Sequence, residues 1–199
     1  MRTSRLEAFS DGVFAIAITL LVLEIRVPVN QGENLWQALG DQWPSYAGYV
    51  ISFLTIGIIW VNHHALFDAV SHATRPLLFL NLGLLMATAF IPFTTALMAD
   101  YLRAANGQDV AAAVYSASFL VMGFCFGAIH LYLQRHGDLV VESISPDQRR
   151  RRTMRAQLGQ IGYAAAIALA FVNAYLSLGI CALVAIYHIH PGASLAAES

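Results

Sequence analysis

The sequence predicts an all-α integral membrane protein whose chain crosses the bilayer six times. Hydrophobic residues make up 58% of the 199 residues and charged residues only 12%, whereas a soluble domain carries about 25% charged residues. Apolar segments recur along the chain, and several reach the roughly 20 residues that a helix needs to cross the hydrocarbon core. We therefore expect one six-helix transmembrane domain over residues 1–190 and a short C-terminal tail over 191–199.

The first expected span covers residues 6–27 and is stopped by Pro28, because proline cannot continue a helix. The second expected span covers residues 44–70. Between them, the segment NLWQALGDQW predicts a short helix in the membrane interface, since Trp36 and Trp43 suit the headgroup region.

The third and fourth expected spans cover residues 75–100 and 108–135. Thr74 is expected to cap the third helix, because its hydroxyl can accept a hydrogen bond from the first turn. Pro92 lies inside that helix and is expected to bend it.

The last apolar segment, residues 157–189, is too long for one span and barely long enough for two. Asn173 and its polar neighbours predict a tight turn within it, and this divides the segment into spans over 156–172 and 174–189. One long, tilted helix is the alternative, because tilt can absorb excess length.

Arginine placement predicts the orientation of the chain. Arginines cluster at the N-terminus, in the connection between the second and third spans, and in the connection before the fifth span: Arg2, Arg5, Arg75, Arg149, Arg150, Arg151, Arg152 and Arg155. Basic residues favour the cytoplasmic side, so six spans place both termini in the cytoplasm. The run at 149–152 is expected to anchor its helix and attract anionic lipid; a ligand-specific role is the alternative.

Four polar residues lie where lipid would penalise them. Asp11 falls near the cytoplasmic end of the first span, and Trp60, Asn62 and His63 fall near the cytoplasmic end of the second. An unpaired carboxylate in lipid is costly, whereas one that accepts hydrogen bonds from histidine, an indole N–H and a hydroxyl is tolerated. We therefore expect the two groups to meet in a structural hydrogen-bond network, in which a buried Asp11 holds the first two helices together.

Helical geometry separates Asp11 from an apolar stripe on the first span. At 100° per residue, Ile16, Leu20 and Leu23 fall within about 60° of one another, and Thr19 lies just beside them. Asp11 falls roughly opposite. If the stripe is the functional face of this helix, Asp11 points away from it and into the bundle.

Metal binding and catalysis find little support in the sequence. His63 and His64 are adjacent and so face different ways, and no cysteine or second acid is placed to complete a metal site. No nucleophile lies beside an Asp11–His63 pair, so we expect no enzymatic activity. Cys125 and Cys181 lie in apolar runs and are expected to be small core residues rather than a disulfide.

The segment RLEAFSDG places Arg5, Phe9, Ser10 and Asp11 in an Arg-x-x-x-Phe-Ser-Asp pattern. This pattern closely resembles the signature first helix of the endosomal–lysosomal potassium channel family, transmembrane protein 175, in its bacterial branch. The WVNHH segment and the six-span length also fit. The resemblance implies a homotetramer in a bacterial plasma membrane, in contact with lipid, that conducts K⁺ passively and other monovalent cations less well. It implies no cofactor and no nucleic-acid partner.

The resemblance also implies which residues line the pore. In this family the first helices of the subunits line the pore. A ring of isoleucine side chains forms its narrowest point, and that isoleucine corresponds here to Ile16. The neighbouring rings correspond to Thr19, Leu20 and Leu23. Such a hydrophobic constriction, in place of a carbonyl selectivity filter, gates by dewetting. The histidine linked to proton sensitivity in the animal channel has no counterpart in the RVPVN segment here.

Two questions stay open at this point. Glu24 would either attract cations to an outer vestibule or simply pair with Arg26. A proton-coupled secondary transporter that uses the Asp11 and His63 cluster is the alternative function, and a membrane scaffold without transport is a third. The sequence contains no inverted repeat and no mid-membrane helix broken by Gly and Pro, features typical of transporters.

Overall fold

A computed structural model describes residues 3–28, 34–140 and 146–189, and this part of the chain is an all-α bundle. The predicted tail at 191–199 lies outside the described residues. The helices, in chain order, are α1 (Thr3–Leu20), the 3₁₀ turn η1 (Leu21–Glu24), α2 (Leu35–Asp41), α3 (Trp43–Phe67), α4 (Arg75–Tyr101), α5 (Gln108–Arg135), the 3₁₀ turn η2 (Gly137–Leu139), α6 (Pro146–Ala170) and α7 (Ala174–Ile189).

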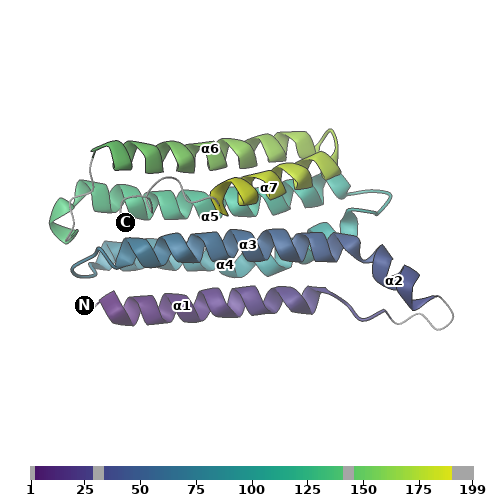
Figure 1. Ribbon diagram of the computed structural model, residues 1–199, viewed down its shortest axis with the longest axis horizontal. Coiled ribbons are helices and arrows are strands. Elements are labelled where there is room, and N and C mark those ends of the chain that lie inside the picture. The colour runs from purple at the N-terminus through teal and green to yellow at the C-terminus, as the bar shows by residue number, and fades with distance from the viewer. Residues whose placement is uncertain (1–2, 29–33, 141–145, 190–199) are drawn as a thin grey trace, which may run out of the picture.

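The long helices lie side by side along one axis, with α1 at one edge of the bundle (Figure 1). α1 packs against α3 and α4, and α5 joins that layer to α6 and α7. Successive long helices run in opposite directions (Figure 1), as short connections require. As a result, α1 begins and α7 ends towards the same end of the bundle.

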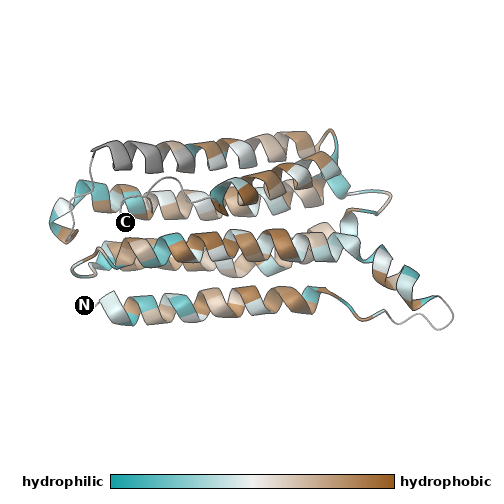
Figure 2. Cartoon of the chain, in the orientation of Figure 1, coloured by the Kyte–Doolittle hydropathy of each residue, from teal (hydrophilic) through white to brown (hydrophobic). Residues whose placement is uncertain are grey.

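The expected second, third and fourth spans are confirmed as helices. In the described ranges, four helices are long and apolar enough to cross a membrane: Thr3–Glu24, Trp43–Phe67, Arg75–Tyr101 and Gln108–Arg135. The segments Ala156–Ala170 and Ala174–Ile189 are shorter apolar helices, so the six-span topology stays a prediction. Apolar residues dominate the central part of the bundle, and polar residues gather towards its ends (Figure 2).

Three expected spans have a boundary that differs from the structure by three residues or more, and the second of them ends at Phe67 rather than at residue 70. The first helix ends at Glu24, because Ile25 is already extended (φ −87°, ψ 99°) and the residue before Pro28 is restricted to extended backbone as well. α6 begins at Pro146, ten residues before the expected start. Arginine is a good helix former and proline suits a first helical turn, so the helix continues through the basic run where the apolar pattern has stopped.

The predicted turn at Asn173 is confirmed, and the alternative of one long tilted helix is wrong. The Asn173 side-chain oxygen accepts hydrogen bonds from the backbone N–H groups of Tyr175 (2.9 Å) and Leu176 (3.2 Å), so Asn173 caps α7. Thr74 occupies the N-cap position of α4 but makes no capping hydrogen bond. Its hydroxyl lies 3.0 Å from the Tyr132 hydroxyl on α5 instead, a partner that the local sequence does not reveal.

Buried hydroxyl groups hold the bundle together alongside its apolar core. The Ser52 hydroxyl lies 2.8 Å from that of Thr95 and 3.0 Å from that of Tyr115, which joins α3, α4 and α5. Ser116 lies 3.0 Å from Ser177, which joins α5 to α7. These groups pair with one another because the hydrocarbon core offers no other hydrogen-bond partners.

The two cysteines are free. Cys181 is fully buried, and its sulfur lies 3.3 Å from the Ser116 hydroxyl. Cys125 is half-buried on α5.

Candidate functional site

α1 has one face packed in the bundle and one face free. Leu6, Phe14, Ala17 and Leu21 are buried in the core cluster that α1 shares with α3 and α4. Together with buried Ser10, these residues recur every three or four positions, as one face of an α-helix requires. The packed face fixes the rotation of α1 and therefore determines which side chains point outward.

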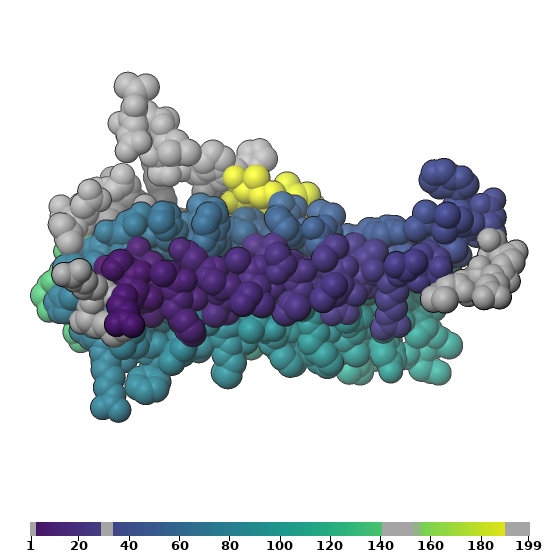
Figure 3. Space-filling view, turned by 90° about the horizontal axis from the view of Figure 1, so that it is seen from below, coloured from purple at the N-terminus to yellow at the C-terminus, as the bar shows by residue number. Residues whose placement is uncertain are grey.

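The predicted stripe lies on the free face of α1. Ile16 is 61% exposed, Leu20 41% and Leu23 70%, and Thr19 is exposed beside them. Figure 3 shows α1 in purple, running along this face of the molecule without another described helix over it. Phe9, which is also exposed, lies seven residues before Ile16 and so extends the same face towards the N-terminal end.

The Thr19 hydroxyl uses its hydrogen within its own helix. Its oxygen lies 2.9 Å from the backbone oxygens of both Ala15 and Ile16. The hydroxyl hydrogen is thus donated inward, which leaves oxygen lone pairs on the free face. The stripe therefore combines apolar side chains with one acceptor group.

Exposure alone does not distinguish a pore face from a lipid face, because α4 also exposes large apolar side chains such as Phe79 and Met86. The free face of α1 also exposes Gly12, Ala15 and the hydroxyl-bearing Thr19. Small residues let helices approach closely in a membrane. This composition suits contact with another helix or with water better than contact with lipid alone.

Asp11 is paired with one of the three donors expected for it, the indole N–H, and not with histidine or a hydroxyl. Its carboxylate accepts a hydrogen bond of 2.8 Å from the indole N–H of Trp60 on α3. Asp11 is only half-buried, because a helix turn of 100° per residue places it about 60° from buried Phe14, at the edge of the packed face. The expectation that Asp11 points into the bundle is therefore wrong for the single chain. No hydrogen bond joins it to His63, which has another partner.

His63 belongs to a second cluster, which is fully buried. Its Nε2 lies 2.8 Å from the side-chain oxygen of Asn81 on α4, and the Asn81 amide donates to the Ser10 hydroxyl at 2.9 Å. Ser10 in turn donates to the Leu6 carbonyl at 2.9 Å. Because the Asn81 oxygen can only accept, the hydrogen-bond network assigns the Nε2 proton to His63. The chain of donors runs from α3 through α4 to α1.

The predicted network thus separates into two clusters. Asp11 pairs with Trp60, and Ser10 joins His63 through Asn81. Arg5, Phe9 and Asn62 belong to neither cluster: all three are exposed, and the Asn62 amide donates to the Ile58 carbonyl of its own helix.

Sequence reasoning missed Asn81. A signal was present, because Asn81 is the only amide side chain in the apolar run of α4, and a polar residue at that depth needs a partner.

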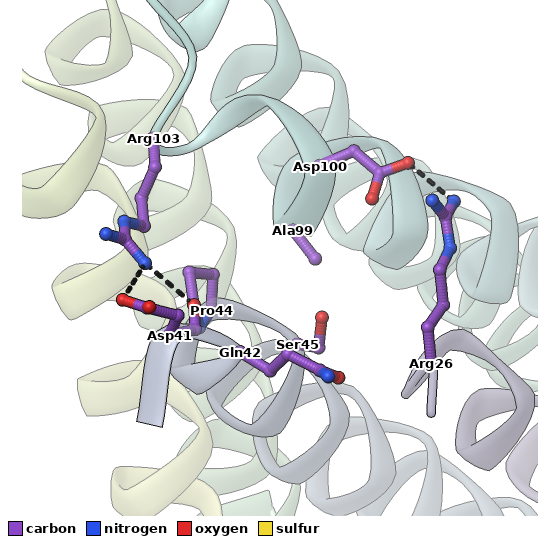
Figure 4. A pocket seen from close by; sticks show the side chains of 8 residues that line it. All are labelled: Arg26, Asp41, Gln42, Pro44, Ser45, Ala99, Asp100 and Arg103. Atoms are coloured by element: carbon purple, nitrogen blue, oxygen red, sulfur yellow. Dashed lines mark hydrogen bonds and ion pairs between the residues drawn. The ribbon is translucent and has the colours of Figure 1, made fainter. Parts of the chain in front are cut away.

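The end of the bundle away from the N-terminus carries a polar pocket. Arg26 donates to the carboxylate of Asp100 at 2.8 Å, and Arg103 donates to that of Asp41 at 2.9 Å. Figure 4 shows these two ion pairs on opposite sides of the pocket. Of the two alternatives for Glu24, pairing with Arg26 is therefore wrong: Arg26 pairs with Asp100, because η1 ends at Glu24 and the extended segment after it carries Arg26 towards α4. In the described residues, no group of three or more His, Cys, Asp or Glu could hold a metal ion.

A bundle of long apolar helices, whose buried serine, threonine, asparagine and histidine side chains are hydrogen-bonded within it, defines a polytopic helical membrane protein. Residues 5–92 match the family described as "Endosomal/lysosomal potassium channel TMEM175". A potassium channel of Streptomyces collinus is 50% identical over 187 residues, which cover 94% of this chain and 91% of that protein. A potassium channel of Chamaesiphon minutus is 40% identical and covers 93% and 92%.

A solved structure agrees with these relatives. The crystal structure of a lysosomal potassium-selective channel TMEM175 homolog from Chamaesiphon minutus has a TM-score of 0.80, at 39% identity and over 99% of this chain and 98% of that one. The chain belongs to the TMEM175 channel family, whose members matched here are channels rather than enzymes. The endosomal/lysosomal proton channel TMEM175 of Gallus gallus is 38% identical over 113 residues, but the match covers only 23% of that longer protein.

Proposed function

We propose that the chain is one subunit of a homotetrameric potassium-permeable cation channel in a bacterial plasma membrane. In this proposal α1 lines a central pore, and K⁺ crosses passively through a hydrophobic constriction at Ile16. The observation that carries it is the free face of α1, where Ile16, Thr19, Leu20 and Leu23 are exposed together. The potassium channels of Streptomyces and Chamaesiphon among the relatives support the choice of ion.

A central pore needs more than one chain. Each chain offers one helix with such a face, and a closed wall around an axis requires several copies related by rotation. The small side chains of Gly12 and Ala15 on that face would let neighbouring copies approach closely.

The constriction would work by dehydration. Four Ile16 side chains on an axis offer an ion no polar group, so a narrow ring of them dewets and forms the main barrier. K⁺ holds its water less tightly than Na⁺, and the ring therefore favours K⁺ modestly. Thr19 would present oxygen acceptors one turn further along, and Glu24 would attract cations to the mouth.

The proposed topology has six crossings and cytoplasmic termini. The alternating directions of the long helices support it, as does the arginine distribution. α7 has 16 residues and so spans about 24 Å, less than the roughly 30 Å of hydrocarbon. Local thinning of the bilayer can absorb this difference.

The alternative of a proton-coupled transporter receives less support. It requires Asp11 and His63 to exchange a proton, but Asp11 pairs with Trp60 and His63 with Asn81. Both interactions are those of satisfied structural groups.

Proteoliposomes that contain only this protein test the proposal. We expect K⁺ efflux down its own gradient, insensitive to an imposed pH gradient, and a tetramer by native mass spectrometry in the same preparation. Flux that requires a pH gradient would favour the transporter, absence of flux the scaffold, and flux from a monomer would exclude a pore lined by four α1 helices.

A further inference from the structure

We infer that Arg26 and Asp100 position the outer mouth of the pore, by tying the outer end of α1 to α4. This inference rests on the proposed function, because it requires α1 to line the pore. It assigns a role in conduction to two residues that lie outside the predicted stripe.

The geometry links Arg26 directly to the proposed pore lining. Arg26 follows Leu23 by three residues and η1 by two, so its side chain holds the backbone that carries the last exposed apolar residue of the stripe. Its guanidinium donates to Asp100 at 2.8 Å. Residues 25–28 are outside any helix, and Ile25, whose N–H donates to the Val22 carbonyl at 3.2 Å, makes the last backbone hydrogen bond to η1.

Asp100, the partner of Arg26, is held in a fixed position by α4. It lies in the last turn of α4, between the fully buried side chains of Met98 and Leu102. Buried neighbours on a continuous helix keep the carboxylate in place. α4 packs against the buried face of α1, opposite the exposed stripe.

This arrangement determines in which direction the ion pair would displace the end of α1. If the stripe faces the pore axis, a bond from Arg26 to α4 draws the end of α1 away from that axis. The ion pair would therefore keep the outer mouth wide, and its loss would let the Leu23 positions move inward. The effect is limited, because the Arg26 side chain is 71% exposed and that of Asp100 47%. An exposed ion pair changes an equilibrium by at most about fivefold.

The second ion pair in the pocket supplies a matched control. Arg103 also donates to a carboxylate, that of Asp41, and to the Asp41 backbone oxygen at 2.8 Å. Its side chains are about half exposed, 48% for Arg103 and 53% for Asp41, and the pair ties the end of α4 to α2 rather than to α1. Figure 4 shows Gln42 and Ser45 between the two pairs.

The experiment compares single-channel K⁺ conductance in planar bilayers for the wild type, Arg26→Gln, Asp100→Asn and Arg103→Gln. We expect Arg26→Gln and Asp100→Asn to lower conductance by about two- to fivefold, and Arg103→Gln to leave it unchanged. The exchanged double variant, Arg26→Asp with Asp100→Arg, should recover most of the loss. Raising impermeant salt to about 1 M on the pocket side should reduce wild-type conductance more than that of Arg26→Gln, because salt screens the pair.

Three results would overturn the inference. Wild-type conductance in Arg26→Gln channels would do so while leaving the proposed function intact. Equal losses in Arg26→Gln and Arg103→Gln would show that the pocket acts only as a general clamp. A wild-type protein that carries no K⁺ would overturn the proposed function and this inference together.

Discussion

Trp60 makes the interaction that allows a carboxylate on a membrane-spanning helix. Its indole N–H reaches Asp11 at 2.8 Å, and its ring stacks on His64 one turn further along α3. The indole is thus held on one side by α1 and on the other by its own helix. Asp11 belongs to the joint between α1 and α3 and lies at the edge of the exposed face.

Removal of the Asp11 carboxylate should weaken this joint. Asp11→Ala leaves the Trp60 N–H without its acceptor, at a cost of about 0.5–1.5 kcal/mol because the pair is partly exposed, whereas Asp11→Asn keeps an acceptor and should cost less. Thermal unfolding in detergent measures both variants. A double-mutant cycle with Trp60→Phe should give a coupling energy of about 0.5–3 kcal/mol, and a coupling near zero would show that the two residues act independently.

Asn81 should matter more to stability than its neighbours on α4. It is the only group that bonds to both His63 and Ser10 in the described structure, so Asn81→Leu leaves the buried His63 ring N–H without a partner. Ser10 loses one bond but still donates to the Leu6 carbonyl. A buried unsatisfied group costs about 1–3 kcal/mol. The control is Leu82→Ala, which removes an exposed side chain on the same helix. Equal unfolding temperatures for the two variants would contradict the role of the buried cluster.

Ile16 and Ile18 test which face of α1 meets the ion. Ile16 is exposed and Ile18 packs against the core, about 200° away around the helix. Ile16→Asn should rewet the constriction, raise K⁺ conductance and lower the K⁺-to-Na⁺ permeability ratio towards unity. Ile18→Asn should reduce stability without opening the pore. The opposite outcome in single-channel recordings would place the pore on the other face.

At the scale of helices, α6 and α7 form a closely packed hairpin. A Cβ atom added at Gly162 would lie 2.5 Å from a methyl carbon of Val184, and one at Gly159 would lie 2.7 Å from the His188 ring. Glycine on α6 thus brings the two helix axes together, as small residues do at helix contacts in membranes.

This close packing predicts that one methyl group added at Gly162 lowers the stability of the protein. Gly162→Ala should destabilise the protein by about 1–3 kcal/mol, the usual cost of overpacking, because the branched Val184 side chain is stiff. Adding Val184→Ala should restore much of the loss. Gly179→Ala on α7 meets nothing within 4 Å and should be neutral or stabilising in the same thermal assay.

The helices show which features of the fold could be predicted from the sequence and which could not. The spans of α3, α4 and α5 follow from long apolar runs, and the free stripe of α1 follows from helical periodicity. The start of α6 does not, because hydropathy reports the lipid boundary while the helix continues past it through the arginines. The partners of His63 and Arg26 lie on α4, 18 and 74 residues away along the chain. Periodicity within one helix gives no information about such contacts.

At the scale of the whole molecule, the buried polar side chains are serine, threonine, asparagine and histidine, without an acid or an arginine among them in the described residues. A transmembrane potential does work only on charge that moves through it, about 2.3 kcal/mol per elementary charge per 100 mV. Rearranging this bundle would displace dipoles and little net charge.

The probability that the channel is open should therefore change little between −100 and +100 mV. A steep voltage dependence in bilayer recordings would contradict this prediction and would require a charge that moves with α1, for which Asp11 is the first candidate. If the recordings show this weak voltage dependence, the signal that opens the protein in the cell is chemical or mechanical rather than the membrane potential.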